Sequence, residues 1–450
     1  MRENKDYLIT EKPSRALLIF SIPMIIGNLF QQAYTIVDSA IVGRYVGETA
    51  LAAVGASYAL TSIFICIAVG GGIGASVIIS HHFGAHNYGR MKTGIRTALL
   101  SFLFISLILG GIGLIFSQQI MEVLNTPADA IDIAVTYLNI YFLGLPFLFM
   151  YNILSSMFNA LGESRIPLYL LIFSSVLNIF LDLYMVAVLN LGVAGAAYAT
   201  FIAQGISAVL SLIIFVVTFQ KLPGKADGWL SKTEFSDMSR IALPSILQQS
   251  TVSIGMMLVQ SVVNSFGTQI LAGFSAAMRI ESLCVVPMSA IGNAMSSYTA
   301  QNIGAEKEER ISQGYRTGNF MIIIIAVILC LFLEIAHKPL IALFLDNAPS
   351  SQTIVTGESY LKFIGFFFCM IGFKMAVDGI LRGAGAVRVF TIANLVNLTL
   401  RVTIAKFGAP IWGVSMVWYA VPLGWLANFL ISYGYYRTGK WKKAVSKTVN

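Results

Sequence analysis

Long apolar segments dominate this sequence, and they limit what the chain can fold into. Twelve segments reach the length of a membrane-spanning helix, which needs about 20 predominantly apolar residues. They cover residues 16–44, 51–80, 92–117, 131–158, 164–188, 192–219, 236–265, 273–302, 314–337, 354–381, 386–407 and 411–437. Only 11% of the residues are charged, less than half of the about 25% that is usual in water-soluble proteins. The sequence therefore predicts an all-α polytopic membrane protein.

The same composition argues against several classes of function. Twelve spans leave no room for a large soluble domain, and the chain has no GxxxxGK(S/T) loop, which disfavours an ATP-driven pump. A membrane-embedded transferase would need clustered acids in an exterior loop, where the chain has only the scattered Asp129, Asp132 and Asp346. We therefore expect no enzymatic activity and no cofactor. The four cysteines all lie in apolar segments, which predicts no disulfide framework.

Basic residues predict the orientation of the chain. The net charge is +8, and with the N-terminus inside most of the 29 Lys and Arg residues fall in segments on the inner side. The positive-inside rule therefore places both termini in the cytoplasm, with the chain in the cell inner (cytoplasmic) membrane, and explains the charge without nucleic acid. Segment 1–15 shows no cleavable signal peptide, and we expect the basic tail, 438–450, to be solvated rather than bound to anionic lipid.

A repeat divides the chain into two halves. Shifting the sequence by 220 residues places Gly84-Ala85, Arg90, Gly94 and Arg96-Thr97 on the identical Gly304-Ala305, Arg310, Gly314 and Arg316-Thr317. Six helices separate equivalent points, so the halves share one orientation and are related by a pseudo-twofold axis along the membrane normal. The predicted organisation is an N-lobe of helices 1–6 (16–219), a cytoplasmic linker (220–239) and a C-lobe of helices 7–12 (240–437).

Acidic residues inside the membrane indicate a functional or structural role, because a charge at the bilayer centre costs roughly 3 kcal/mol on insertion scales. Asp38 is the clearest case, and Gln31 and Tyr34 precede it on the same face of helix 1. Asn178 and Asp182 lie one turn apart on helix 5 and point toward the same half of the membrane. Two carboxyls this close can share one proton, or ionise together around a hard cation. Either outcome predicts a coupling site in the N-lobe.

The C-lobe lacks these acids. A shift of 223 residues places Arg401 at the position of Asn178 and Ala405 at that of Asp182, so a cation there would meet a fixed positive charge. Its other charged side chains are expected to form structural ion pairs, Arg279 with Glu281 and Lys374 with Asp378.

Other polar side chains recur at helical spacing, and we expect them to line a cavity or to hydrogen-bond between helices. The candidates for a substrate cavity are Gln31, Tyr34, Asn152, Ser156, Gln249 and Gln260. His81, His82 and His86 have no acidic or cysteine neighbour in the sequence, so we expect no metal there. The one metal ion that the residues allow is sodium, at the coupling site.

Five stretches together resemble the multidrug and toxic compound extrusion (MATE) transporters, a family within a larger group that includes polysaccharide and lipid flippases. They are QQAYTIVDSAIVGRYVG (31–47), NALGESRIPLYLL (159–171), LNIFLDLYMV (177–186), QNIGA (301–305) and ILRGAG (380–385). The resemblance covers essentially the whole chain. It implies an N-lobe coupling site made of Asp38, Asn178, Asp182 and Thr200, and a bend of helix 1 at Pro23. Another branch of the family uses an acid on helix 7, which this chain lacks.

The resemblance implies a secondary active exporter of amphipathic organic cations, an antiporter that takes up protons or sodium ions by alternating access. It is expected to work as a monomer in the lipid bilayer with no required protein partner. The residues leave the coupling ion open and favour protons slightly, because the apolar neighbours of Asp182 stabilise a neutral acid. The alternative is a flippase of lipid-linked oligosaccharides or other lipids, disfavoured because such chains usually carry more cavity arginines than Arg279 and Arg401.

Overall fold

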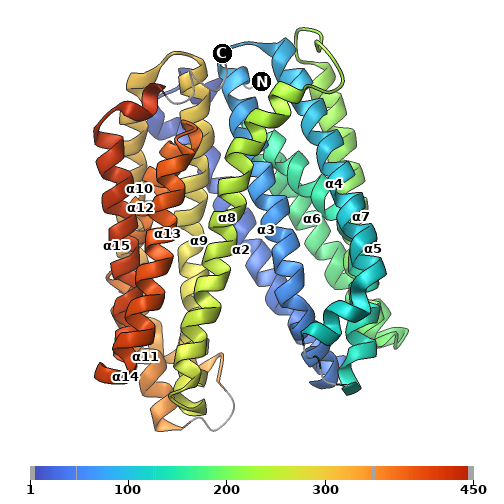
Figure 1. The fold of residues 1–450 in the computed structure, drawn as a ribbon, viewed down its shortest axis with the longest axis vertical. Helices are drawn as coiled ribbons and strands as arrows, with labels where there is room; N and C mark the ends of the chain where they lie inside the picture. Colours follow the sequence, from blue (N-terminus) through green and yellow to red (C-terminus); the bar gives the residue numbers. More distant parts are fainter. Residues whose placement is uncertain (1–5, 47, 125, 127, 346–349, 444–450) are drawn as a thin grey trace. The chain divides into compact units, whose positions relative to one another are not determined.

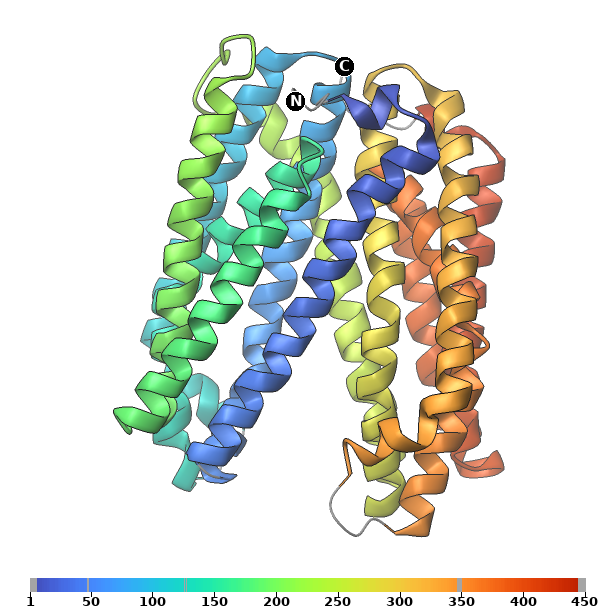
Figure 2. The ribbon, with the colours of Figure 1, turned by 180° about the vertical axis from the view of Figure 1, so that it is seen from behind.

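A computed structural model describes residues 6–46, 48–124, 126, 128–345 and 350–443 of the chain. Asp346, residues 1–5 and the end of the predicted tail, 444–450, lie outside these residues. Every regular element among the described residues is a helix (Figures 1 and 2). Eleven helices are long and apolar enough to cross a membrane, and twelve spans result when one bent pair counts as a single span. The chain is therefore an integral membrane protein of the predicted all-α class.

The chain forms two compact units. The first, here the N-unit, is residues 26–246. It holds the part of α2 (Pro13–Tyr45) from Ile26, α3 (Glu48–Gly84), α4 (Tyr88–Val123), α5 (Ala128–Ala160), α6 (Arg165–Asp182), the π-helix η1 (Leu183–Val188), α7 (Gly192–Gln220) and the part of α8 (Lys232–Asn264) up to Ile246.

The second, here the C-unit, is residues 1–25 together with 247–450. Besides its parts of α2 and α8, it holds α1 (Tyr7–Thr10), α9 (Thr268–Gly304), α10 (Glu308–Ala342), α11 (Ser351–Gly365), α12 (Phe368–Gly383), α13 (Val387–Thr403), the π-helix η2 (Ile404–Gly408), α14 (Ala409–Trp412), α15 (Ser415–Arg437) and the short 3₁₀ helix η3 (Lys440–Lys443).

The two units differ from the predicted lobes at the first helix of each half. The beginning of α2 packs with the C-unit, and the beginning of α8 packs with the N-unit. Within each of these helices the unit changes shortly after a proline, Pro23 in α2 and Pro244 in α8. The lobe boundaries at 219 and 240 follow the sequence repeat, whereas the units follow packing, and a helix of 33 residues can pack on two bodies.

Three predicted helices are interrupted. Segment 354–381 is not one helix, because α11 ends at Gly365 and α12 starts at Phe368 with a 53° bend between them. In the two other cases an α-helix changes to a π-helix, at Asp182 in the N-unit and at Thr403 in the C-unit. This shared change, together with glycines of positive φ at positions 162 and 192 in one half and 385 and 413 in the other, confirms the repeat.

Small residues let the helices of the C-unit approach closely. A methyl group added at Gly379 of α12 would press on the backbone carbonyl of Gly292 in α9. One turn further along α12, a methyl group at Gly383 would press on the carbonyl of Ser296. The α9–α12 contact therefore depends on the missing side chains, as is common between membrane helices.

We predict that Gly379→Ala lowers the free energy of unfolding by about 1–3 kcal/mol, because the added methyl group overpacks a backbone contact. Gly434→Ala in α15 is the control, since its added methyl group meets nothing within 4 Å. Thermal unfolding in detergent measures both variants. Equal melting temperatures would contradict the close α9–α12 contact.

Candidate cation-coupling site

Two carboxyl groups meet inside the N-unit. Asp38 comes from α2 and Asp182 from the last residue of α6, and their side chains lie within hydrogen-bonding reach of each other. Asp182 is fully buried and Asp38 is half-buried. Among the described residues, neither Oδ1 atom has a hydrogen-bond donor. Because two adjacent carboxylates repel each other, this pair needs a shared proton or a cation between its oxygens.

Asn178 connects the carboxyl pair to a third helix. Of its two possible amide orientations, one satisfies all its neighbours: the nitrogen donates to Oδ2 of Asp182 (2.6 Å) and to the hydroxyl of Tyr34 (3.2 Å). In that orientation the amide oxygen accepts from the backbone nitrogen (3.0 Å) and Oγ1 (3.3 Å) of Thr200 in α7. The structure thus brings together the four predicted coupling residues, and it adds Tyr34, which was predicted to line the substrate cavity.

Tyr137 of α5 is a neighbour that the sequence analysis missed. It lies close enough to Asp38 and Asp182 to interact with both electrostatically. A single tyrosine in an apolar helix carries no signal of its own, because such residues are common in membrane helices. Only the packing of α5 against the other helices of the N-unit identifies it.

The backbone also distinguishes this site. Asp182 is the last residue of α6, and η1 begins directly after it. A π-helix changes the hydrogen-bond pattern of the backbone and often occurs at functional sites. It places Asp182 at a local irregularity instead of within a uniform helix.

The other cavity candidates are divided between the two units. Gln31, Asn152 and Ser156 belong to the N-unit, and Gln249 and Gln260 belong to the C-unit. The amide of Asn152 donates to the Leu148 carbonyl of its own helix (2.8 Å). Their role in a substrate cavity remains a prediction.

His82, at the end of α3, has an acidic partner that comes from a distant segment of the chain. Nε2 of His82 lies 3.0 Å from Oε2 of Glu234, and both side chains are buried. Arg90 approaches the other oxygen of the same carboxylate, with 3.5 Å between Nε and Oε1. Glu234 is 152 residues away in sequence, which is why no acidic partner was evident. The contact fixes the start of α8 to the end of α3 within the N-unit.

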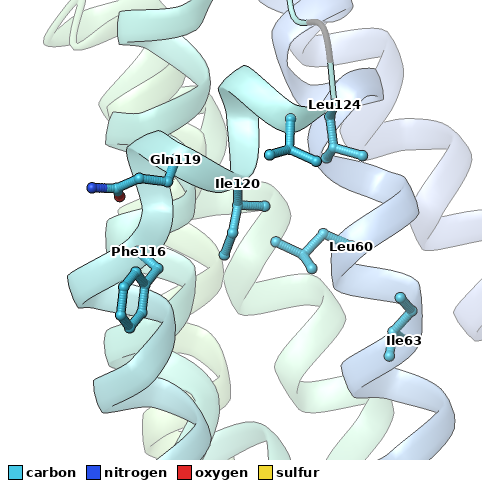
Figure 3. Close-up of a pocket in the computed structure, with 7 residues that line it drawn as sticks. Leu60, Ile63, Phe116, Gln119, Ile120 and Leu124 are labelled. Atoms are coloured by element: carbon cyan, nitrogen blue, oxygen red, sulfur yellow. The ribbon is translucent and has the colours of Figure 1, made fainter.

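A groove of about 350 Å³ lies between α3 and α4, at the opposite end of α4 from the linker (Figure 3). Its lining residues are Leu60, Ile63, Phe116, Gln119, Ile120, Val123 and Leu124. Figure 3 shows the Gln119 side chain pointing away from Leu60 and Ile63. The groove offers no carboxylate to a cation, so it is separate from the coupling site.

Comparison with known proteins identifies the family. A sequence profile of the MatE family matches residues 23–184 and 244–406, one match in each half. The chain belongs to the MatE family. The "Probable multidrug resistance protein YpnP" of Bacillus subtilis (strain 168) is 31% identical over 429 residues, covering 95% of this chain and 96% of that protein. The "FAD transporter" of Shewanella oneidensis is 22% identical over 427 residues, 94% of each.

Solved structures show the same fold. A structure described as the outward-facing conformation of a multidrug resistance MATE family transporter matches with a TM-score of 0.89 at 24% identity. The match covers 98% of this chain and 100% of that chain. The predicted architecture of twelve helices in two six-helix lobes is therefore confirmed for this MatE-family protein.

The C-unit of this MatE-family protein holds a different set of buried charges. The predicted pair forms, with Nζ of Lys374 3.2 Å from Oδ2 of Asp378. The hydroxyl of Ser432 donates to Oδ1 of Asp378 (2.7 Å), and Lys374 also donates to Oδ1 of Asn394 (3.2 Å). Every charge in this group has a partner, as expected for a structural network.

The other predicted pair is wrong. Glu281 accepts a hydrogen bond from the Tyr360 hydroxyl (2.6 Å) and lies near Arg401, whereas Arg279 is exposed. Residues two apart on a helix point to different sides, so Arg279 and Glu281 do not face each other.

The alignment of the repeat near Asp182 also changes. Aligning the starts of η1 and η2 gives a shift of 404 − 183 = 221 residues, and Asp182 then corresponds to Thr403 instead of Ala405. Neither alignment places an acid at that position in the C-unit.

We predict that Lys374→Met lowers the free energy of unfolding by about 3–5 kcal/mol, because it leaves the buried Asp378 carboxylate without its cation. The double variant Lys374→Met/Asp378→Asn should recover most of this loss. Thermal unfolding in detergent measures the cycle. A single variant as stable as the wild type would show that the pair does not neutralise a buried charge.

Proposed function

We propose that this MatE-family protein is a secondary active exporter that extrudes amphipathic organic cations in exchange for a coupling ion bound at Asp38 and Asp182. The observation that carries the proposal is the contact between these two carboxyls inside the N-unit. Such a pair changes its charge when it gains or loses one cation, and this is what coupling requires. The chain works as a monomer in the inner membrane with both termini in the cytoplasm.

The proton is the coupling ion that the geometry favours. In the satisfied orientation, the amide of Asn178 presents its nitrogen to Asp182 and turns its oxygen toward Thr200. A sodium ion would need that oxygen as a ligand, because hard cations bind carboxylate, amide and hydroxyl oxygens. A proton shared between Asp38 and Asp182 needs neither Asn178 nor Thr200 to change its contacts.

Alternating access follows from these properties. A proton that enters the site removes one of the two negative charges of the pair, and the loss of that proton leaves two adjacent carboxylates that repel each other inside an apolar bundle. The two states differ in electrostatic free energy, so each favours a different arrangement of the helices that carry the carboxyls, α2 and α6. Exchange results if the site opens to only one side of the membrane at a time.

The proposal that the substrates are organic cations rests on the names of the relatives and on the charge of the buried carboxyl groups. A multidrug resistance protein is among the relatives, and amphipathic cations suit a site whose buried charges are carboxylates. A flippase of lipid-linked oligosaccharides remains the alternative. Uptake assays with tetraphenylphosphonium and with FAD, the substrate in another relative's name, distinguish cation export from dinucleotide transport.

Asp38→Asn should abolish proton-driven uptake of tetraphenylphosphonium into inverted vesicles, because an amide can neither release a proton nor balance a cation. Asp182→Asn should have the same effect. Asp132→Asn is the matched control, since Asp132 is an exposed acid of the same unit. Transport that persists in Asp38→Asn would remove the coupling role of the pair.

Asn178→Ala and Thr200→Ala test the identity of the ion. If protons couple, both variants should retain a large share of uptake, and sodium should have no effect at fixed pH. Proteoliposomes with an imposed sodium or proton gradient provide the measurement. Strict sodium dependence, together with severe loss in both variants, would establish sodium as the coupling ion.

A further inference from the structure

The linker between the two halves is fixed to the start of α4. Nζ of Lys92 donates to the backbone carbonyls of Leu222 (2.7 Å) and Gly224 (2.9 Å). Further along, Oγ1 of Thr93 accepts from the Asp227 nitrogen and Oγ1 of Thr97 accepts from the Ser231 nitrogen, both at 2.9 Å. Residues 222–231 are therefore a part of the N-unit with a defined path, beside the start of α4 in Figures 1 and 2.

The face of α4 that contacts the linker is also the exposed face of this helix. With 3.6 residues per turn, the residues that contact the linker, Lys92, Thr93, Arg96 and Thr97, lie on the same face as a set of exposed apolar residues further along the helix. These are Leu100, Leu103, Phe104 and Leu107, which are 37–66% exposed. The opposite face, with Ile95, Ala98 and Ser106, is buried. In a membrane-spanning helix the exposed apolar face contacts lipid, so the linker crosses the end of a lipid-facing surface.

Trp229 marks the position of the linker relative to the bilayer. Its ring stacks on the guanidinium of Arg96, 4.7 Å from the ring centre, one turn before Leu100. Trp229 is 73% exposed and its neighbour Leu230 is 63% exposed. A tryptophan next to an apolar helix end is typical of the membrane–water interface, where its ring lies at the level of the headgroups.

The exposed charges of the linker favour anionic lipids. Lys221, Lys225 and Lys232 are all exposed, whereas Asp227 is the one exposed acid of the linker; Glu234 and Asp237 are buried. These lysines lie in a segment that the distribution of basic residues predicts to be cytoplasmic. The cytoplasmic leaflet is the anionic one, and basic side chains near its surface are attracted to it.

We propose that the linker is an interfacial anchor: Trp229 and Leu230 enter the headgroup layer of the cytoplasmic leaflet, and Lys225 and Lys232 bind phosphates of anionic phospholipids. A lipid is favoured over a protein partner because the exposed residues continue the lipid-facing side of α4. The anchor rests on the predicted orientation and is independent of the coupling site.

Fluorescence quenching tests the insertion of the ring. The full-length protein and its Trp229→Phe variant are placed in phospholipid nanodiscs, with lipids brominated near the headgroup or unbrominated. The emission that the variant lacks belongs to Trp229. It should be quenched by the brominated lipid and protected from aqueous acrylamide. Strong quenching by acrylamide without quenching by bromine would overturn the proposal.

Binding of phosphatidylglycerol tests the lysines. Lys225→Gln/Lys232→Gln should weaken the preference of the protein for spin-labelled phosphatidylglycerol over phosphatidylcholine, by about fivefold for each charge lost. Lys338→Gln/Lys406→Gln is the matched control, since both of its lysines are exposed and belong to segments predicted to be exterior. Equal losses in the two double variants, or no preference in the wild type, would overturn the proposal. All these variants change exposed side chains, and thermal unfolding of each variant verifies that it is folded.

Discussion

The N-unit holds two carboxyl groups next to each other in an apolar bundle, and the free energy that this costs is the main constraint on its structure. Asp182 is fully buried, and its carboxyl meets that of Asp38 from another helix. Because Asp182 is buried, solvent screens the repulsion between the two carboxylates poorly, and a shared proton or a bound cation would relieve it. The neighbouring polar groups contact the pair from one side: the amide nitrogen of Asn178 donates to Asp182, and its oxygen accepts from Thr200. The C-unit neutralises its buried acid differently, by pairing Asp378 with Lys374 on the same helix.

The two halves resemble each other in their helices and also in how each unit binds the segment that leads into the first helix of a half. In the N-unit, Lys92 holds carbonyls of the linker that leads into α8. In the C-unit, Asn302 and Lys307 hold the carbonyls of Leu8 and Ile9 in the segment that leads into α2 (3.1 and 3.0 Å). Backbone carbonyls without a helical partner are satisfied by polar side chains in both places. The segment before the first helix of each half is thus held close to the turn between α3 and α4 in the N-unit and between α9 and α10 in the C-unit.

Much of the fold was predictable from the sequence, because the bilayer imposes length and apolar character on every span. The two acids of the proposed coupling site stand out for the same reason, because an acid such as Asp38 is conspicuous in an apolar segment, whereas Thr200 is expected only from the resemblance to the family. Tertiary contacts between distant segments were not. His82 and Glu234 are 152 residues apart, and the bend after Gly365 interrupts a segment that reads as continuous. The pairing of Glu281 with Tyr360, instead of with Arg279, likewise depends on the packing of α9 on α11.

Infrared spectroscopy of the purified protein tests most directly whether Asp38 and Asp182 share a proton. If the pair shares a proton, the wild type should show the C=O band of a buried protonated carboxyl at neutral pH. Addition of sodium should leave this band unchanged, and Asp38→Asn and Asp182→Asn should each change its frequency or intensity. A wild-type protein without the band, or a band that sodium abolishes, would show that Asp38 and Asp182 do not share a proton.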